Sequence, residues 1–170
     1  LFVKARIDPW KDETVIYTTE KALDKRQAEL KELIEIKMFE NARAIGVAAA
    51  HGDLSENSEW KFAIEERDML RVRAAKMQDE ISRARVITAE SIAEDSVGIG
   101  SKVILKKVSD GSELKLTFLG PWDSDLTQNI FSYQTQLAQD LMGSMIGDTV
   151  SVRLGDNEAE YTIQRILPGL

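Results

Sequence analysis

One run of residues, spaced alternately by three and four, constrains the middle of the chain more than any other feature. It lies between Leu54 and Thr88 and consists of Trp60, Ala63, Arg67, Leu70, Ala74, Met77, Ile81 and Ala84. Seven of these eight residues are apolar, which is typical of the heptad seam of a coiled coil. The stretch therefore predicts a long helix that packs along one face against another helix.

A second helix-forming stretch runs from Thr19 to about Ala50. It lacks proline and is rich in Ala, Leu, Glu and Lys. Its predicted seam is less regular, with Leu23, Leu30, Ile34 and Ala48 interrupted by Gln27, Lys37 and Asn41. Two arms of similar length predict one antiparallel helical hairpin over residues 20–88, with its turn within 50–56. At 1.5 Å per residue each arm is on the order of 45–50 Å long, which suits a structure that reaches a partner.

After Ser91 the period changes to that of strands. Lys102–Val108 and Ser112–Leu119 predict one hairpin across the turn at 109–111. Asp148–Leu154 and Glu158–Ile166 predict a second hairpin, and Thr135–Met142 predicts a short helix stopped by Gly143. The expected fold class is α+β: an N-terminal coiled-coil hairpin followed by a small antiparallel sheet with one short helix.

The change of period also suggests where the domains divide. We expect an upstream segment or linker at 1–15, the hairpin domain at 16–88, a linker at 89–100 and the sheet domain at 101–170. Residues 98–170 are expected to fold alone. Since the chain begins at Leu1 rather than methionine, we expect it to be a piece of a longer protein.

Composition excludes several classes of protein. The net charge is −7, and residues 89–170 hold 6 basic and 12 acidic residues, which argues against nonspecific binding to a nucleic-acid duplex. No run of 18 apolar residues predicts a membrane span. The absence of cysteine removes disulfides and thiolate zinc sites, and suits a reducing cytoplasm. A single histidine argues against multi-histidine metal sites.

The predicted turn, HGDLSENSEW at 51–60, repeats an acid every third residue at Asp53, Glu56 and Glu59. In one interpretation Asp53 is the N-cap of the second helix and Glu56 occupies its N3 position, a variant of the capping box. In another, Asp53 and Glu56 share a hard cation such as Mg²⁺, with the remaining ligands supplied by a partner. A docking surface is a third interpretation. His51 is expected to be a turn residue.

Three segments, VIYTTEKALDKRQAEL, HGDLSENSEW and ISRARVI, resemble the N-terminal coiled coil of the bacterial GreA/GreB transcript cleavage factors. Gly52–Trp60 fits the family's tip signature, Gly-Asp-Leu-x-Glu-Asn-x-Glu-aromatic, with tryptophan in place of the usual tyrosine. The segment FSYQTQLAQDLMGSMIGDTVSV is similar to the family's FKBP-like C-terminal domain. The resemblance covers roughly residues 16–167.

The resemblance implies a transcription elongation factor that is not itself an enzyme. Its coiled coil would enter the secondary channel of a stalled RNA polymerase, where Asp53 and Glu56 would help hold Mg²⁺ and orient water. The polymerase would then cleave its own backtracked RNA near the 3′ end. The implied protein is cytoplasmic, monomeric when free, and binds no cofactor tightly by itself. Residues expected to support the tip are Gly52, Leu54, Asn57, Glu59 and Trp60.

Charged positions leave alternatives open. Arg67, Arg71 and Arg73 are candidate contacts to RNA or polymerase, or a solvated helix face. Ala49 and Ile64 stand where the family usually has arginines flanking the tip, and Thr135-Gln136 and Gly143-Ser144 replace its usual Ser-Pro and Gly-Lys pairs. A Gre-like regulator that binds polymerase without stimulating cleavage is therefore an alternative function. A prolyl isomerase or chaperone is a third, although the sequence shows no aromatic-lined proline pocket.

Overall fold

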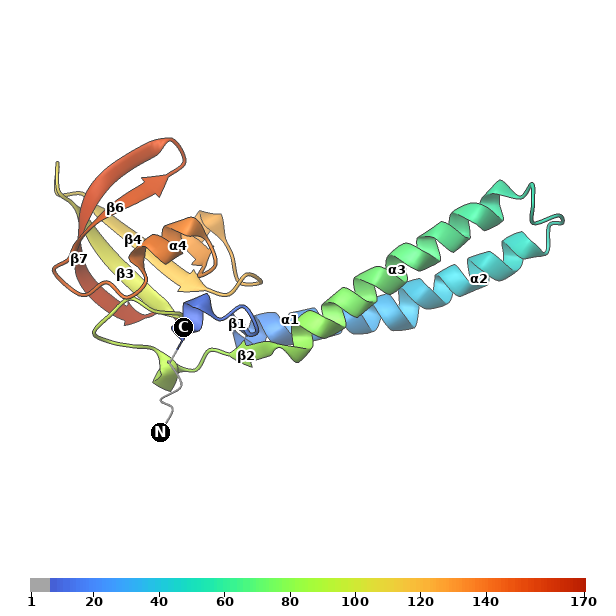
Figure 1. The fold of residues 1–170 in the computed structure, drawn as a ribbon, viewed down its shortest axis with the longest axis horizontal. Helices are drawn as coiled ribbons and strands as arrows, with labels where there is room; N and C mark the ends of the chain where they lie inside the picture. Colours follow the sequence, from blue (N-terminus) through green and yellow to red (C-terminus); the bar gives the residue numbers. More distant parts are fainter. Residues whose placement is uncertain (1–6) are drawn as a thin grey trace. The chain divides into compact units, whose positions relative to one another are not determined.

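The computed structural model describes residues 7–170, which form two compact units (Figure 1). One unit is Leu23–Arg83. The other combines the described residues up to Ala22 with Ala84–Leu170. None of the described helices is both long and apolar enough to cross a membrane.

The first unit is the predicted helical hairpin. Its first arm consists of α1 (Glu20–Glu32), a π-helical turn (Leu33–Lys37) and α2 (Met38–Ala49), and its second arm is α3 (Ser58–Ser82). In Figure 1 α2 and α3 run side by side and are joined at one end by the loop Ala50–Asn57. The predicted turn and the start of the first arm are confirmed. The seven predicted seam residues that lie in α3, Trp60 to Ile81, are all buried or half-buried, which confirms the heptad over the length of this helix.

The second arm is shorter than predicted. Its helix ends at Ser82, and Ala84–Val86 forms strand β2, which pairs in parallel with β1 (Ile16–Thr18). The prediction of helix as far as Thr88 was wrong because Ile16–Thr18, far away in the sequence, provides a pairing partner for this segment.

In the first arm, some of the buried residues differ from those predicted for the seam. Leu33 is buried and Ile34 is exposed, and the next inward side chain is Met38, five residues after Leu33. The π-helical turn at Leu33–Lys37 adds one residue to a normal helical turn. The residues on both sides of it can therefore face α3, although Ile34 and Lys37 do not occupy the seam as predicted.

The second unit contains a five-stranded sheet in the order β5-β4-β3-β7-β6. Its strands are β3 (Ser101–Lys107), β4 (Glu113–Leu119), β5 (Ile130–Ser132), β6 (Thr149–Leu154) and β7 (Asn157–Pro168). Both predicted hairpins, β3–β4 and β6–β7, are confirmed. The sheet is mixed, however, because β5 pairs with β4 in parallel. The expectation of a purely antiparallel sheet was wrong here, since a three-residue strand is too short to show alternation.

The predicted short helix is α4 (Gln136–Leu141). The hydroxyl of its N-cap Thr135 accepts a hydrogen bond from the Ala138 backbone N at 3.3 Å. Ala138 and Leu141 pack into the core of the unit, against side chains from the sheet such as Phe118 and Ile163.

Segments that precede and follow the hairpin in the sequence also belong to this unit. Pro9–Lys11 forms a short 3₁₀ helix, and the Trp10 carbonyl accepts a hydrogen bond from the Gln139 side chain at 3.1 Å. In the predicted linker, Ala89–Ser91 forms another 3₁₀ helix, and Ile92 and Val97 are buried. Whether 16–88 and 101–170 fold independently remains a prediction.

Candidate functional site

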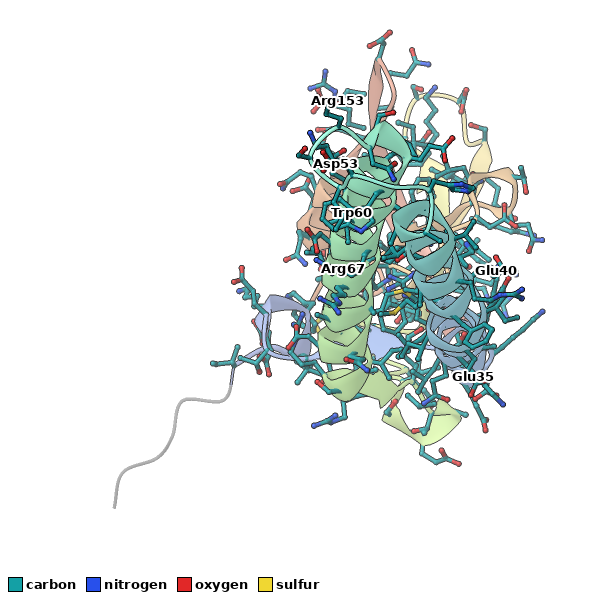
Figure 2. All side chains as sticks on the ribbon, turned by 90° about the vertical axis from the view of Figure 1, so that its right-hand side faces the viewer. Glu35, Glu40, Asp53, Trp60, Arg67 and Arg153 are labelled. Atoms are coloured by element: carbon teal, nitrogen blue, oxygen red, sulfur yellow. The ribbon has the colours of Figure 1, made fainter. Side chains whose placement is uncertain are left out.

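The acidic loop Ala50–Asn57 connects the two arms of the hairpin. In Figure 2 Asp53 lies in this loop, and Trp60 and Arg67 follow it along α3. Residues 51–56 are all exposed, whereas Trp60 is half-buried in the seam. The loop thus presents its carboxylates to solvent, while the aromatic residue of the signature is partly shielded from it.

Asp53 does not cap α3. Its Oδ1 accepts hydrogen bonds from the Ser55 backbone N at 3.0 Å and from the Ser55 hydroxyl at 2.8 Å. These two bonds, the backbone bond first, hold the pKa of the Asp53 carboxyl below its usual range. The predicted capping box of Asp53 and Glu56 was wrong. Asp53 instead stabilises a local turn, and its Oδ2 accepts no hydrogen bond from any described residue.

Asn57 is the N-cap of α3 and also ties the two arms together. Its Oδ1 accepts a hydrogen bond from the Trp60 backbone N at 2.9 Å. Its Nδ2 donates to the Ala48 carbonyl of α2 at 2.6 Å. One side chain therefore satisfies a backbone group at the start of α3 and another at the end of α2. The sequence predicts only a supporting role for Asn57 in the loop.

The acids of the signature share one shallow hollow of about 490 Å³. It is lined by His51, Asp53, Glu56, Asn57, Ser58 and Glu59. Gly52 lies beside it with φ of 130°, a conformation that glycine adopts more readily than other residues. Leu54 is exposed and does not reach the seam. The structure thus brings Asp53, Glu56 and Glu59 to a single polar surface.

The donor atoms at this surface suit a hard cation, because carboxylate oxygens are the ligands that Mg²⁺ prefers. Over residues 7–170, however, no group of three or more His, Asp or Glu side chains is arranged to hold a metal ion. Asp53 and Glu56 could therefore contribute to a Mg²⁺ site only if another molecule supplied the remaining ligands.

The three candidate arginines do not all share one face of α3. Arg67 is half-buried in the seam, and its guanidinium pairs with Asp68 at 3.2 Å. Arg71 and Arg73 are exposed, but residues two apart on a helix do not face the same way. Their contact with RNA or polymerase remains a prediction. Near the loop, Ala49 is exposed and Ile64 is half-buried. Because both are apolar residues, neither position provides a positive charge.

Comparison with known proteins places both units in one family. Residues 16–86 match the family described as "Transcription elongation factor, N-terminal", and residues 92–168 match "Transcription elongation factor, GreA/GreB, C-term". The chain belongs to the GreA/GreB family of transcription elongation factors. The resemblance seen in the sequence is thereby confirmed.

Relatives within the GreA/GreB family differ in length. Transcription elongation factor GreA of Chlamydia trachomatis serovar D is 38% identical over 142 residues, which cover 84% of this chain and 20% of that protein. GreA of Treponema pallidum (strain Nichols) is 34% identical over 151 residues, covering 89% of this chain and 93% of that protein. The chain thus spans about a fifth of the length of its chlamydial relatives.

Two solved structures are similar over most of the chain. GreA factor homolog 1 (Gfh1) of Thermus thermophilus is 20% identical, with 90% of this chain and 99% of that chain covered and a TM-score of 0.41. GreA/GreB of Nitrosomonas europaea is also 20% identical, with 89% and 97% covered and a TM-score of 0.40.

Proposed function

We propose that this protein inserts its helical hairpin into the secondary channel of RNA polymerase and stimulates the polymerase to cleave backtracked RNA. The observation that carries the proposal is the exposure of the two signature acids. Asp53 and Glu56 are exposed in the hairpin loop, and neither is used to cap a helix. Both carboxylates are thus available to a partner at the end of the hairpin.

In this mechanism the protein contributes side chains to a site that polymerase completes. Asp53 and Glu56 would hold Mg²⁺ together with ligands from polymerase. When bound, the metal lowers the pKa of a coordinated water and polarises the phosphodiester. Ser55 orients Asp53 through Oδ1, leaving Oδ2 for the partner. Asn57 holds the two ends of the loop together.

The proposal also defines the partners and the setting. The partners are RNA polymerase and the 3′ end of the nascent RNA. Mg²⁺ would be shared with polymerase and not bound tightly by the free monomer. The protein would act in the bacterial cytoplasm and would not be a nuclease by itself.

The double variant Asp53→Asn/Glu56→Gln tests the proposal. Mg²⁺ strongly prefers anionic oxygen, so stimulated cleavage on stalled elongation complexes should fall by about 100-fold or more. Polymerase binding should hardly change, and the hairpin should stay folded because Asn57, not Asp53, caps α3. Full cleavage by the double variant would contradict the role of these acids.

A second candidate function is that of a Gre-like regulator which occupies the channel without stimulating cleavage. It is favoured by Ala49 and Ile64, which provide no positive charge near the loop. Wild-type protein that binds polymerase but leaves backtracked RNA uncleaved would support it. Ala49→Arg is then the variant to assay first, since Ala49 is exposed and can accept a longer side chain.

A further inference from the structure

A buried asparagine lies in the seam of the hairpin. Asn41 of α2 is only 5% exposed. Its Nδ2 donates to the Ala63 carbonyl of α3 at 3.0 Å and approaches the Glu66 carboxylate at 3.4 Å. Both acceptors lack a proton to give, so the amide nitrogen must face them. Asn41 therefore uses its amide group to bind the opposite arm.

An asparagine is an unusual choice for this position. A leucine in a coiled-coil seam would bury more apolar surface and would need no hydrogen-bond partner. A polar residue at one seam position lowers stability but selects a single register, because any shifted alignment leaves its polar group buried without a partner. The contacts of Asn41 meet this condition.

Asn57 makes the reciprocal contact. It donates from the start of α3 to the Ala48 carbonyl of α2, whereas Asn41 donates from α2 to the Ala63 carbonyl of α3. Both acceptor residues are buried alanines, whose small side chains leave their carbonyls within reach. The loop-proximal parts of α2 and α3 are thus joined by two side-chain hydrogen bonds.

The Asn57–Ala48 bond and an ion pair between Arg26 and Glu80 at 3.1 Å also join the arms, but the connecting loop does not dictate their register. The connecting loop, Ala50–Asn57, has eight residues, too many to impose one alignment as a tight turn would. The π-helical turn at Leu33–Lys37 separates two parts of the first arm that are out of phase by one residue. A slip of one helical turn would displace the arms by about 5.4 Å and change the number of residues in the loop.

From these contacts we infer that Asn41 is a positioning residue, which fixes the register of α2 against α3 and thereby the conformation of the loop that carries Asp53 and Glu56. The part of this inference that concerns cleavage rests on the proposed function. The part that concerns register does not.

Register can be measured without polymerase. The chain contains no cysteine, so Ala42→Cys and Gln78→Cys, both at exposed positions on opposite arms, would carry the only two spin labels. The labelled protein should show one narrow distance. With Asn41→Leu added, a second population should appear, displaced by about 5 Å, while the thermal midpoint stays equal or rises. Asn41→Ala, which removes the amide without adding bulk, should show the same second population.

Ile45→Leu is the matched control, because it changes a half-buried residue of the same helix without removing a polar contact. It should leave the distance unchanged. A single unshifted distance in both Asn41 variants would overturn the inference. So would an Asn41→Leu variant that melts at a much lower temperature in an unchanged register, since the amide would then serve stability alone.

The cleavage assay tests the link to the loop. Asn41→Leu should lower the maximal rate of stimulated cleavage roughly tenfold or more and leave the half-saturating concentration unchanged, because misplaced groups reduce catalysis more than binding. Wild-type rates in a variant with shifted register would overturn this link. If the wild-type protein stimulates no cleavage, the proposed function fails, whereas the label distances still decide the role of Asn41 in register.

Discussion

At the scale of single residues, the Asp53 carboxylate accepts local hydrogen bonds on one oxygen and still remains exposed to solvent. Asp12 and Asp110 form the same turn, each accepting hydrogen bonds from the backbone N and the hydroxyl of the residue two positions later, Thr14 and Ser112. In all three turns these bonds lower the pKa of the aspartate. In these three turns the Asp-x-Ser/Thr sequence orients an exposed carboxylate locally.

Ser55→Ala should raise the pKa of Asp53 toward the usual aspartate value. The hydroxyl bond is lost, while the backbone bond, the larger cause of the lowered pKa, can remain. An NMR pH titration of the side-chain carboxyls measures this change. Ser112→Ala is the matched control, expected to raise the pKa of Asp110 and leave that of Asp53 unchanged. An Asp53 pKa that Ser55→Ala does not move would contradict the role of the hydroxyl.

The lowered pKa of Asp53 also makes the stability of the folded protein depend on pH. The pKa of Asp53 is lower in the folded protein than in the unfolded chain. Its contribution to stability is therefore present above the unfolded pKa and disappears as the pH falls through the lowered value. The difference in unfolding free energy between wild type and Ser55→Ala should thus become smaller as the pH falls through the lowered pKa, which denaturant unfolding at several pH values measures.

At the scale of elements, the π-helical turn compensates for one surplus residue in the first arm. Leu30 before it, Leu33 at its first position and Met38 after it form one apolar cluster with Leu70, Ala74 and Met77 of α3. A regular α-helix would rotate one of these groups out of the seam by about 100°. The turn lets both groups remain in contact with the second arm.

Deleting Glu35 should therefore convert the π-helical turn into regular α-helix and leave the seam intact. Glu35 is exposed, and its loss reduces the spacing from Leu33 to Met38 from five to four. The free energy of unfolding, measured with denaturant, should stay within about 1 kcal/mol of wild type. Deleting Ala42, which is also exposed, is the control and should cost about 2–5 kcal/mol, because it moves buried side chains out of the seam. Equal losses from both deletions would be evidence against this account.

At the scale of the whole chain, the sheet unit is assembled from two segments that the hairpin separates in sequence. The Tyr17 backbone N donates to the Tyr133 hydroxyl at 3.1 Å, and the two rings pack edge to face at 5.9 Å. The Asp123 carboxylate accepts hydrogen bonds from the Thr18 hydroxyl and the Thr19 backbone N, both at 3.2 Å. A Cβ at Gly120 would lie 2.0 Å from the Tyr17 carbonyl, so only glycine fits there. The segment before the hairpin is thus part of this unit.

A spliced protein tests this assembly. Joining residues 1–22 to 84–170 through a Gly/Ser linker of about eight residues, a flexible chain of sufficient reach, should give a unit that unfolds cooperatively. It should melt at a higher temperature than residues 98–170 alone, which lack β1, β2 and the fully buried Val97. Calorimetry of both proteins measures the difference. Equal midpoints would show that the segment before the hairpin adds no stability.

What the sequence by itself determined has a local physical basis. The heptad of α3, the two β-hairpins with their glycine-containing turns and the short helix α4 depend on residues close together in the chain. Helical and strand periods are set by the backbone of each element, so they can be read without knowing the partners. The signature at Gly52–Trp60 likewise identified the family and the exposed acids.

Only the tertiary structure decided the features that depend on distant partners. Asp53 and Asn57 are equally good N-caps by residue type, and the choice follows from the bond of Asn57 to Ala48 on the other arm. Ile34 and Leu33 are equally apolar, and the π-helical turn places Leu33 inward because α3 packs there. The pairing of β1 with β2, and of β5 with β4, brings together segments whose short runs carry no period of their own. Asn41 interrupts the pattern in the sequence, and it fits the seam because the Ala63 carbonyl lies opposite.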